Sequence, residues 1–88
     1  KVPYLSQYND WAKRLKAAFD KTYSFIPGTD EPAIKAVFTE IPTQTAFINV
    51  GKVYNKLYIA NLITDLKSEL EFYEYNDYMK IILSKPKG

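Results

Sequence analysis

The sequence of 88 residues contains no histidine and no cysteine. These absences exclude imidazole bases, thiolate nucleophiles, disulfide bonds and the usual zinc ligands within this chain. No apolar run approaches the roughly 20 residues that a membrane-spanning helix needs. A chain without cysteine suits a reducing compartment, and we expect an intracellular protein, cytoplasmic or nuclear.

Arginine is nearly absent too, since Arg14 is the only one among twelve basic residues. Ten acidic residues leave a net charge of +2 at pH 7, far from the dense positive field of a protein that binds duplex nucleic acid. Because guanidinium groups make bidentate contacts with phosphates and bases, a surface dominated by lysine disfavours base-specific readout. Gly28 and Gly51 stand alone, so the chain has no glycine-rich loop for phosphate.

Apolar residues are abundant by contrast, at 47% of the chain, and eight tyrosines and five phenylalanines supply most of the aromatic rings. The length is that of one domain, and we expect residues 1–88 to fold around one continuous core.

The stretch 33–50 is predicted to form a β-hairpin. Both of its arms are rich in β-branched and aromatic residues, and the turn residues Pro42 and Thr43 separate them. Strand side chains alternate between two faces, so one face of the hairpin is uniformly apolar. The other face mixes polar with apolar side chains and consists of Lys35, Val37, Thr39, Thr45, Phe47 and Asn49.

Two segments show the spacing of three and four residues that is typical of amphipathic helices. The first spans residues 6–25, with a predicted core face that includes Trp11, Leu15, Ala18 and Phe19. The second spans residues 53–70, with Val53, Leu57, Ala60, Leu66 and Leu70 inward. Residues 56–62 also fit a strand, because Tyr58 and Ile59 favour β structure. The helix is preferred, and the strand stays open as an alternative.

The two ends of the chain are predicted to be strands. Residues 1–5 would form a short edge strand, and residues 78–84 a last strand after a turn at Asn76 and Asp77. In that last strand Met79, Ile81 and Leu83 would face the core, and Tyr78, Lys80 and Ile82 would face outward. The predicted fold class is therefore α+β, with the ferredoxin-like order β-α-β-β-α-β. Both helices would cover one face of a four-stranded antiparallel sheet.

This topology, together with residues 43–50, resembles the RNA recognition motif. Ala46, Phe47, Ile48 and Val50 match the pattern of that family's third strand, whereas Thr43, Gln44 and Thr45 depart from its basic residue, glycine and first aromatic residue. The resemblance implies an open sheet on which bases stack, with Phe47 as the matched platform and Tyr4 beside it. Residues 57–62 match the family's first-strand hexamer, but too few residues follow them to complete a domain.

From these patterns we expect a non-catalytic binding module without a cofactor or metal. Glu69, Glu71, Glu74 and Asp77 lack the ligand pattern of a calcium loop, and we interpret them as a solvated face. Catalysis would need converging carboxylates that no spacing here predicts. A protein partner or a second copy is the leading hypothesis, and weak binding of single-stranded RNA or DNA is the alternative. The predicted binding surface is Tyr4, Lys35, Val37, Thr39, Thr45, Phe47, Tyr78, Lys80 and Ile82.

Overall fold

The computed structural model describes residues 5–21 and 28–88, and within these ranges the fold is a bundle of five α-helices with no strand. The helices are α1 (Leu5–Asp20), α2 (Glu31–Glu40), α3 (Gln44–Tyr58), α4 (Leu62–Glu69) and α5 (Phe72–Leu83). The predicted α+β fold and ferredoxin-like order are therefore wrong. The resemblance to the RNA recognition motif is overturned with them, because that motif requires a β-sheet.

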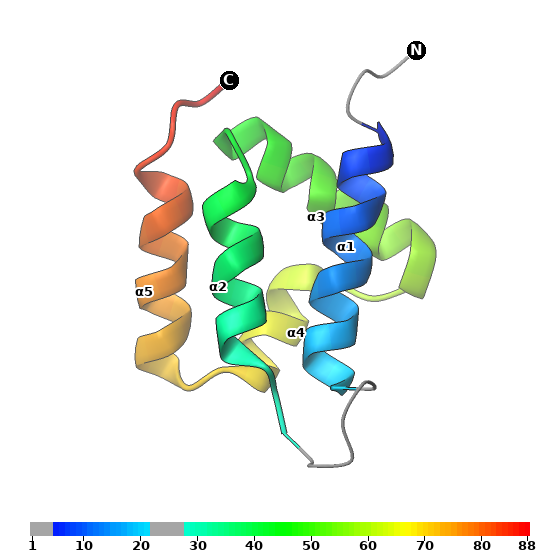
Figure 1. Ribbon diagram of the computed structural model, residues 1–88, viewed down its shortest axis with the longest axis vertical. Helices are drawn as coiled ribbons and strands as arrows, with labels where there is room; N and C mark the ends of the chain where they lie inside the picture. The colour runs from blue at the N-terminus through cyan, green and yellow to red at the C-terminus, as the bar shows by residue number, and fades with distance from the viewer. Residues whose placement is uncertain (1–4, 22–27) are drawn as a thin grey trace.

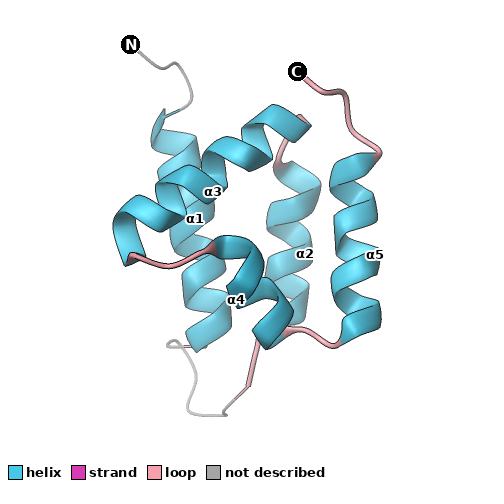
Figure 2. Cartoon of the chain, turned by 180° about the vertical axis from the view of Figure 1, so that it is seen from behind, coloured by secondary structure: helices cyan, strands magenta, loops and turns pink. Residues whose placement is uncertain are grey.

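The helices lie in two layers. In Figure 1, α1, α2 and α5 stand side by side, with α2 between the other two. Seen from behind in Figure 2, α3 crosses α1 and α2 at an angle and the short α4 lies below it. This arrangement leaves one side of α3 without a covering helix.

The segment predicted as a hairpin consists of two helices, α2 and α3, joined at Pro42. In a strand, Val37 and Phe38 would point to opposite faces, yet both are fully buried, as adjacent residues on one helix face can be. Local caps begin both helices: the Asp30 carboxylate accepts a hydrogen bond from Ala33 N at 3.2 Å, and Thr43 Oγ1 accepts one from Ala46 N at 3.0 Å. These caps and the core contacts outweigh the β preference of the side chains.

The predicted second helix was correct in type but not in extent. Residues 53–70 include the end of α3 and all of α4. The helix α3 ends before Ile59, which adopts a left-handed conformation. The helix α4 then begins at Asn61, whose side chain accepts a hydrogen bond from Thr64 N at 2.9 Å. Residues 56–62 are thus the junction of two helices and not a strand.

The predicted last strand is also wrong, because residues 78–83 belong to α5 and the expected turn at Asn76 and Asp77 lies inside that helix. The helical register reverses two of the predicted sides, because Ile82 is buried and Leu83 is 63% exposed. Met79 and Ile81 pack against the core and Lys80 is exposed, as predicted. The predicted strand at residues 1–5 lies outside the described residues except for Leu5, which is helical.

The helix predicted over residues 6–25 is confirmed over residues 6–20, with Trp11, Leu15, Ala18 and Phe19 buried as predicted, and its residues 22–25 lie outside the described residues. The core is made of side chains from all five helices and includes edge-to-face ring pairs, such as Phe38 with Phe47 at 5.3 Å between centroids. Its largest fully buried side chains are Tyr54, Phe38, Leu15, Ile34, Ile41 and Leu66. No described helix is both long and apolar enough to cross a membrane.

Candidate functional site

The residues predicted as a binding surface do not form one surface. Val37, Phe47 and Ile82 lie in the core, and Tyr78 is half-buried with its ring 6.0 Å from that of Phe38. The exposed members are scattered: Lys35 and Thr39 on α2, Thr45 at the start of α3, and Lys80 on α5. Tyr4 lies outside the described residues. A sheet face that would have gathered these side chains does not exist in the described chain.

The uncovered side of α3 presents a different set of side chains to solvent. Ile48 is 57% exposed, Ile59 is 86% exposed, and between them lie exposed polar residues. We call this strip the α3 ridge, and it consists of Ile48, Lys52, Asn55, Lys56 and Ile59. Ile48, Lys52, Asn55 and Lys56 are related by spacings of three and four and share one face of α3, and Ile59 is the residue that ends the helix.

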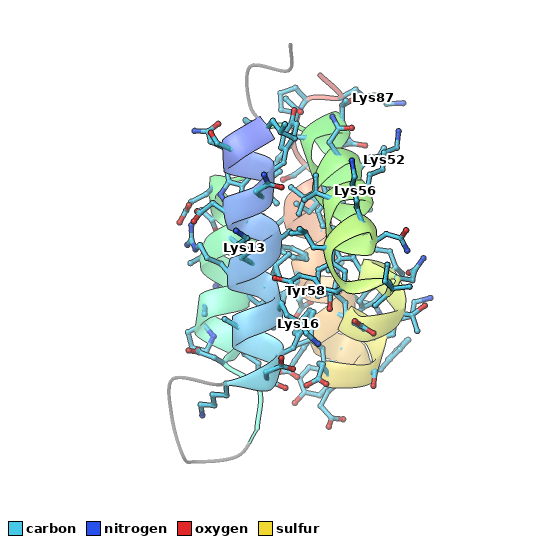
Figure 3. The ribbon with its side chains drawn as sticks, turned by 90° about the vertical axis from the view of Figure 1, so that its right-hand side faces the viewer. Lys13, Lys16, Lys52, Lys56, Tyr58 and Lys87 are labelled. Carbon is cyan, nitrogen blue, oxygen red and sulfur yellow. The ribbon has the colours of Figure 1, made fainter. Side chains whose placement is uncertain are left out.

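Lysines gather around the α3 ridge. Figure 3 shows Lys13 and Lys16 of α1, Lys52 and Lys56 of α3, and Lys87 after α5 on the same side of the molecule. We call these five residues the lysine face. Lys16 is engaged, 3.5 Å from an Asp20 carboxylate oxygen and 5.7 Å from the Tyr58 ring centroid. The other four have no ion-pair partner among the described residues.

Two shallow grooves flank the α3 ridge. The groove between α3 and α4 encloses about 490 Å³ and is lined by Ile48, Gly51 and Asn55 on one side and Asn61, Leu62 and Ile63 on the other. The groove between α1 and α3 encloses about 380 Å³ and is lined by Leu5 and Asn9 of α1 and by Lys52, Val53, Lys56 and Leu57 of α3. Each groove thus combines apolar side chains with cationic or amide groups at the rim.

The left-handed residue Ile59 ends α3 and begins the turn into α4. Its φ of 52° and ψ of 46° are unfavourable for a β-branched side chain, and glycine is the usual residue at such a position. The turn is held by two hydrogen bonds: Ile59 N donates to Asn55 O at 2.8 Å, and Asn55 Nδ2 donates to Ala60 O at 3.2 Å. The chain therefore holds a large apolar side chain in solvent at some cost in backbone energy.

Buried contacts fix the position of α3 beneath this surface. The hydroxyl of Tyr54, whose side chain is fully buried, donates to an Asp65 carboxylate oxygen at 2.5 Å and so joins α3 to α4. Burial, and next the bond to Asp65, raise the pKa of Tyr54. The hydroxyl therefore stays protonated and keeps donating across the physiological pH range.

The segment after α5 caps the other end of α3. Gln44 N donates to Pro86 O at 2.9 Å, and Thr45 N donates to Lys87 O at 3.0 Å. The Thr45 hydroxyl also donates to Lys87 O, at 2.7 Å. Since the first amides of a helix have no partner within the helix, these carbonyl groups satisfy two of them and place Lys87 beside α3.

An ion pair joins α1 to α2. The Arg14 guanidinium donates to both carboxylate oxygens of Glu40, at 2.6 and 2.8 Å, and Trp11 Nε1 donates to Glu40 Oε1 at 3.2 Å. The hydrogen bonds from Arg14 are the main reason that the pKa of Glu40 falls from 4.5 to about 2. Arg14 is therefore occupied away from the lysine face.

Acidic and aromatic residues meet at the junction of α4 and α5. Phe72 and Tyr73 are 82% and 64% exposed in the first turn of α5. Acidic residues surround them, and we call this set the acidic corner: Glu69, Glu71, Phe72, Tyr73, Glu74 and Asp77. Glu74 also accepts a hydrogen bond from Glu71 N at 2.9 Å, as part of a capping box.

The same carboxylates affect a neighbouring phenol. Burial raises the pKa of Tyr78, and the negative charges of Glu74, Glu31 and Asp77 raise it further.

No group of three or more acidic side chains in the described part of the chain is arranged to hold a metal ion. The absence of catalysis and of a cofactor stays a prediction.

Comparisons with protein-family models, with curated proteins and with solved structures gave no match to this chain. The candidate site therefore rests on its geometry.

Sequence reasoning missed the α3 ridge because it divided the ridge between different elements. It assigned Ile48 to a strand and Lys52 to the connection that follows, and it placed Lys56 and Ile59 in the helix predicted over residues 53–70. One signal was present. With Thr43 taken as a helix cap, a helical period would have placed Ile48, Lys52 and Asn55 opposite the apolar stripe of Ala46, Phe47 and Val50.

Proposed function

We propose that this protein is a non-catalytic binding module, and that its α3 ridge docks an acidic segment of another protein that carries apolar side chains. One observation carries the proposal: α3 exposes Ile48 and Ile59 at the two ends of a strip whose centre holds Lys52 and Lys56, cations without a described ion-pair partner.

The apolar part of the strip supplies affinity. Burying an isoleucine side chain stabilises a complex by about 1.5–3 kcal/mol, so a partner that covers both Ile48 and Ile59 gains affinity from each. The exposed fractions of Ile48 and Ile59, 57% and 86%, leave most of each side chain available to a partner. The grooves on either side provide room for the partner's own apolar side chains.

The cationic part of the strip supplies orientation and speed of association. Complementary charges raise the rate of encounter and disfavour partners of the wrong sign. Lys13, Lys52, Lys56 and Lys87 lie on one side of the molecule. The exposed carboxylates outside the acidic corner, Asp10, Asp20 and Glu40, each form an ion pair with Arg14 or Lys16. An acidic partner is therefore attracted to the α3 side.

Single-stranded nucleic acid is the second candidate, because a cluster of unpaired lysines also suits a phosphate backbone. Such binding commonly adds base stacking on exposed rings. Among the described residues, the exposed rings are Phe72 and Tyr73, and they lie at the acidic corner, where carboxylates repel phosphates. On the lysine face, Tyr58 is half-buried near Lys16. The rings that could stack on bases therefore lie apart from the lysines that could neutralise phosphates. This separation favours a protein partner over a nucleic acid.

A heteronuclear NMR titration tests the proposal with three probes. The first is a helical peptide of Glu, Ala and Leu with its leucines on one face. The second has the same charge but glutamine in place of leucine, and the third is a short oligothymidylate. We expect the leucine peptide to shift the amide signals of Ile48, Lys52, Asn55 and Ile59, and the glutamine peptide to bind at least about tenfold more weakly.

The matched variants are K52A/K56A on the α3 ridge and K35A/K80A on α2 and α5. We expect the first pair to weaken the leucine peptide about tenfold or more, and the second to leave its affinity within about twofold. The proposal is overturned if the peptide does not shift the ridge signals. It gives way to the nucleic-acid function if oligothymidylate binds the same residues more tightly than the peptide does.

A further inference from the structure

We infer that the partner segment is the acidic corner of a second copy of this chain, so that copies associate head to tail. The inference rests on the proposed function of the α3 ridge and names its occupant. Two surfaces on one molecule have complementary chemistry.

The acidic corner has the composition that the α3 ridge requires of a partner. Phe72 and Tyr73 offer two exposed rings, and Glu69, Glu71 and Asp77 are exposed carboxylates around them. The α3 ridge offers two exposed isoleucines around Lys52 and Lys56. Lys67 also lies near the corner, but its ammonium group sits 5.5 Å from the Tyr75 ring centroid, where it is attracted to that ring.

Charge excludes the symmetric alternatives. A dimer that paired one α3 ridge with another would bring Lys52 and Lys56 of both copies together, and a dimer of two acidic corners would oppose carboxylates. Like charges at an interface are unfavourable, so these pairings are selected against. Only the pairing of ridge with corner joins opposite charges and apolar groups at once.

The positions of the two surfaces determine the kind of assembly. In Figure 1, α5 and α1 flank α2 on opposite sides, and α3 packs on α1. A copy bound through its acidic corner therefore leaves its own α3 ridge free for another copy. Contacts of this heterologous type produce rings or open chains. Since only a few side chains take part, we expect weak, reversible association that depends on protein concentration.

Sedimentation of two complementary variants tests the inference. K52E/K56E reverses the charge of the α3 ridge, and F72S/Y73S removes the exposed rings of the acidic corner. Both pairs alter exposed side chains outside the core. Circular dichroism verifies the fold, and K52Q/K56Q replaces the first variant if that variant unfolds.

We expect the mean mass of the wild-type protein to rise with concentration and each variant alone to remain a monomer. An equimolar mixture of the two variants should form dimers and nothing larger, because only one intact ridge and one intact corner remain per pair. The inference is overturned if the wild type associates while the mixture stays monomeric, since the contact is then not ridge to corner.

It is also overturned if the wild type remains a monomer at millimolar concentration. In that case the leucine peptide separates the two proposals: a monomer that binds the peptide at the α3 ridge leaves the proposed function standing, and a monomer that does not bind it contradicts both.

Discussion

Replacing Ile59 with glycine should stabilise the fold while weakening the interaction that we propose. Ile59 has a φ of 52°, which costs a residue with a β-carbon about 1–2 kcal/mol. Its side chain is 86% exposed, so removing it sacrifices little core burial. The main change in the free energy of the folded state is therefore the relief of backbone strain at position 59.

The expected gain is smaller than the strain itself. Glycine gives the unfolded chain extra conformational freedom that lowers stability by about 0.4–1 kcal/mol. The balance is a stabilisation of about 0.5–1 kcal/mol for I59G, or a rise in Tm of about 2–8 °C for a domain of this size. Thermal unfolding followed by circular dichroism measures it.

The variant I59A is the matched control. Alanine keeps the β-carbon, and with it part of the strain, but removes the rest of the apolar side chain. We expect I59A to gain less stability than I59G, and both variants to bind the leucine peptide about tenfold more weakly than the wild type. A glycine variant less stable than the wild type would refute the reasoning, because Ile59 would then contribute packing that outweighs its strain.

Three further substitutions test individual contributions to the stability of the fold. Tyr54→Phe removes the hydrogen bond to Asp65 and should destabilise the fold by about 1–2 kcal/mol in urea unfolding; no change would show that the bond contributes nothing. Glu40 is ionised in the fold down to about pH 2 but has an ordinary pKa of 4.5, so its pairing with Arg14 stabilises the fold fully above pH 4.5 and less as the pH falls toward 2. Glu40→Gln should cost about 0.5–1 kcal/mol at pH 7 and flatten that acid dependence, and an unchanged pH profile would contradict this. Gly51→Ala should add about 0.5–1 kcal/mol, because the helix interior favours alanine and the new β-carbon would lie at an ordinary 3.9 Å from Leu62 Cδ2; destabilisation would mean that the site lacks room.

The sequence predicts α1 well because its pattern has no competing interpretation. Trp11, Leu15 and Phe19 repeat at a spacing of four, and the intervening residues are mostly charged or small. A strand would place Lys13 on the same face as these three side chains, whereas the helix turns Lys13 away from them and adds Ala12 and Ala18 to the buried stripe.

The segments of α2 and α3 misled the prediction because local preference and tertiary packing disagree there. Ile34, Val37 and Phe38 favour strands individually, yet together they form one helical stripe. The decisive local signals were the caps at Asp30 and Thr43, whose side chains satisfy the first free amides of each helix. Interpreted as a turn residue together with Pro42, Thr43 suggested a hairpin.

The candidate site was harder to predict because it depends on contacts between helices. No glycine or proline marks the break at Ile59, so its left-handed conformation and outward side chain follow from the packing of α4 on α3. The lysine face likewise exists only because α1 and α3 pack together, which brings Lys13 beside residues about 40 positions away in the chain.

The most direct test of the α3 ridge is the heat-capacity change when the leucine peptide binds, measured by isothermal titration calorimetry at several temperatures. Burial of apolar surface makes that change negative. We predict a clearly negative value for the wild type and a markedly smaller one for I48S/I59S. A value near zero for the wild type, or an equal value for both proteins, would contradict apolar docking on α3.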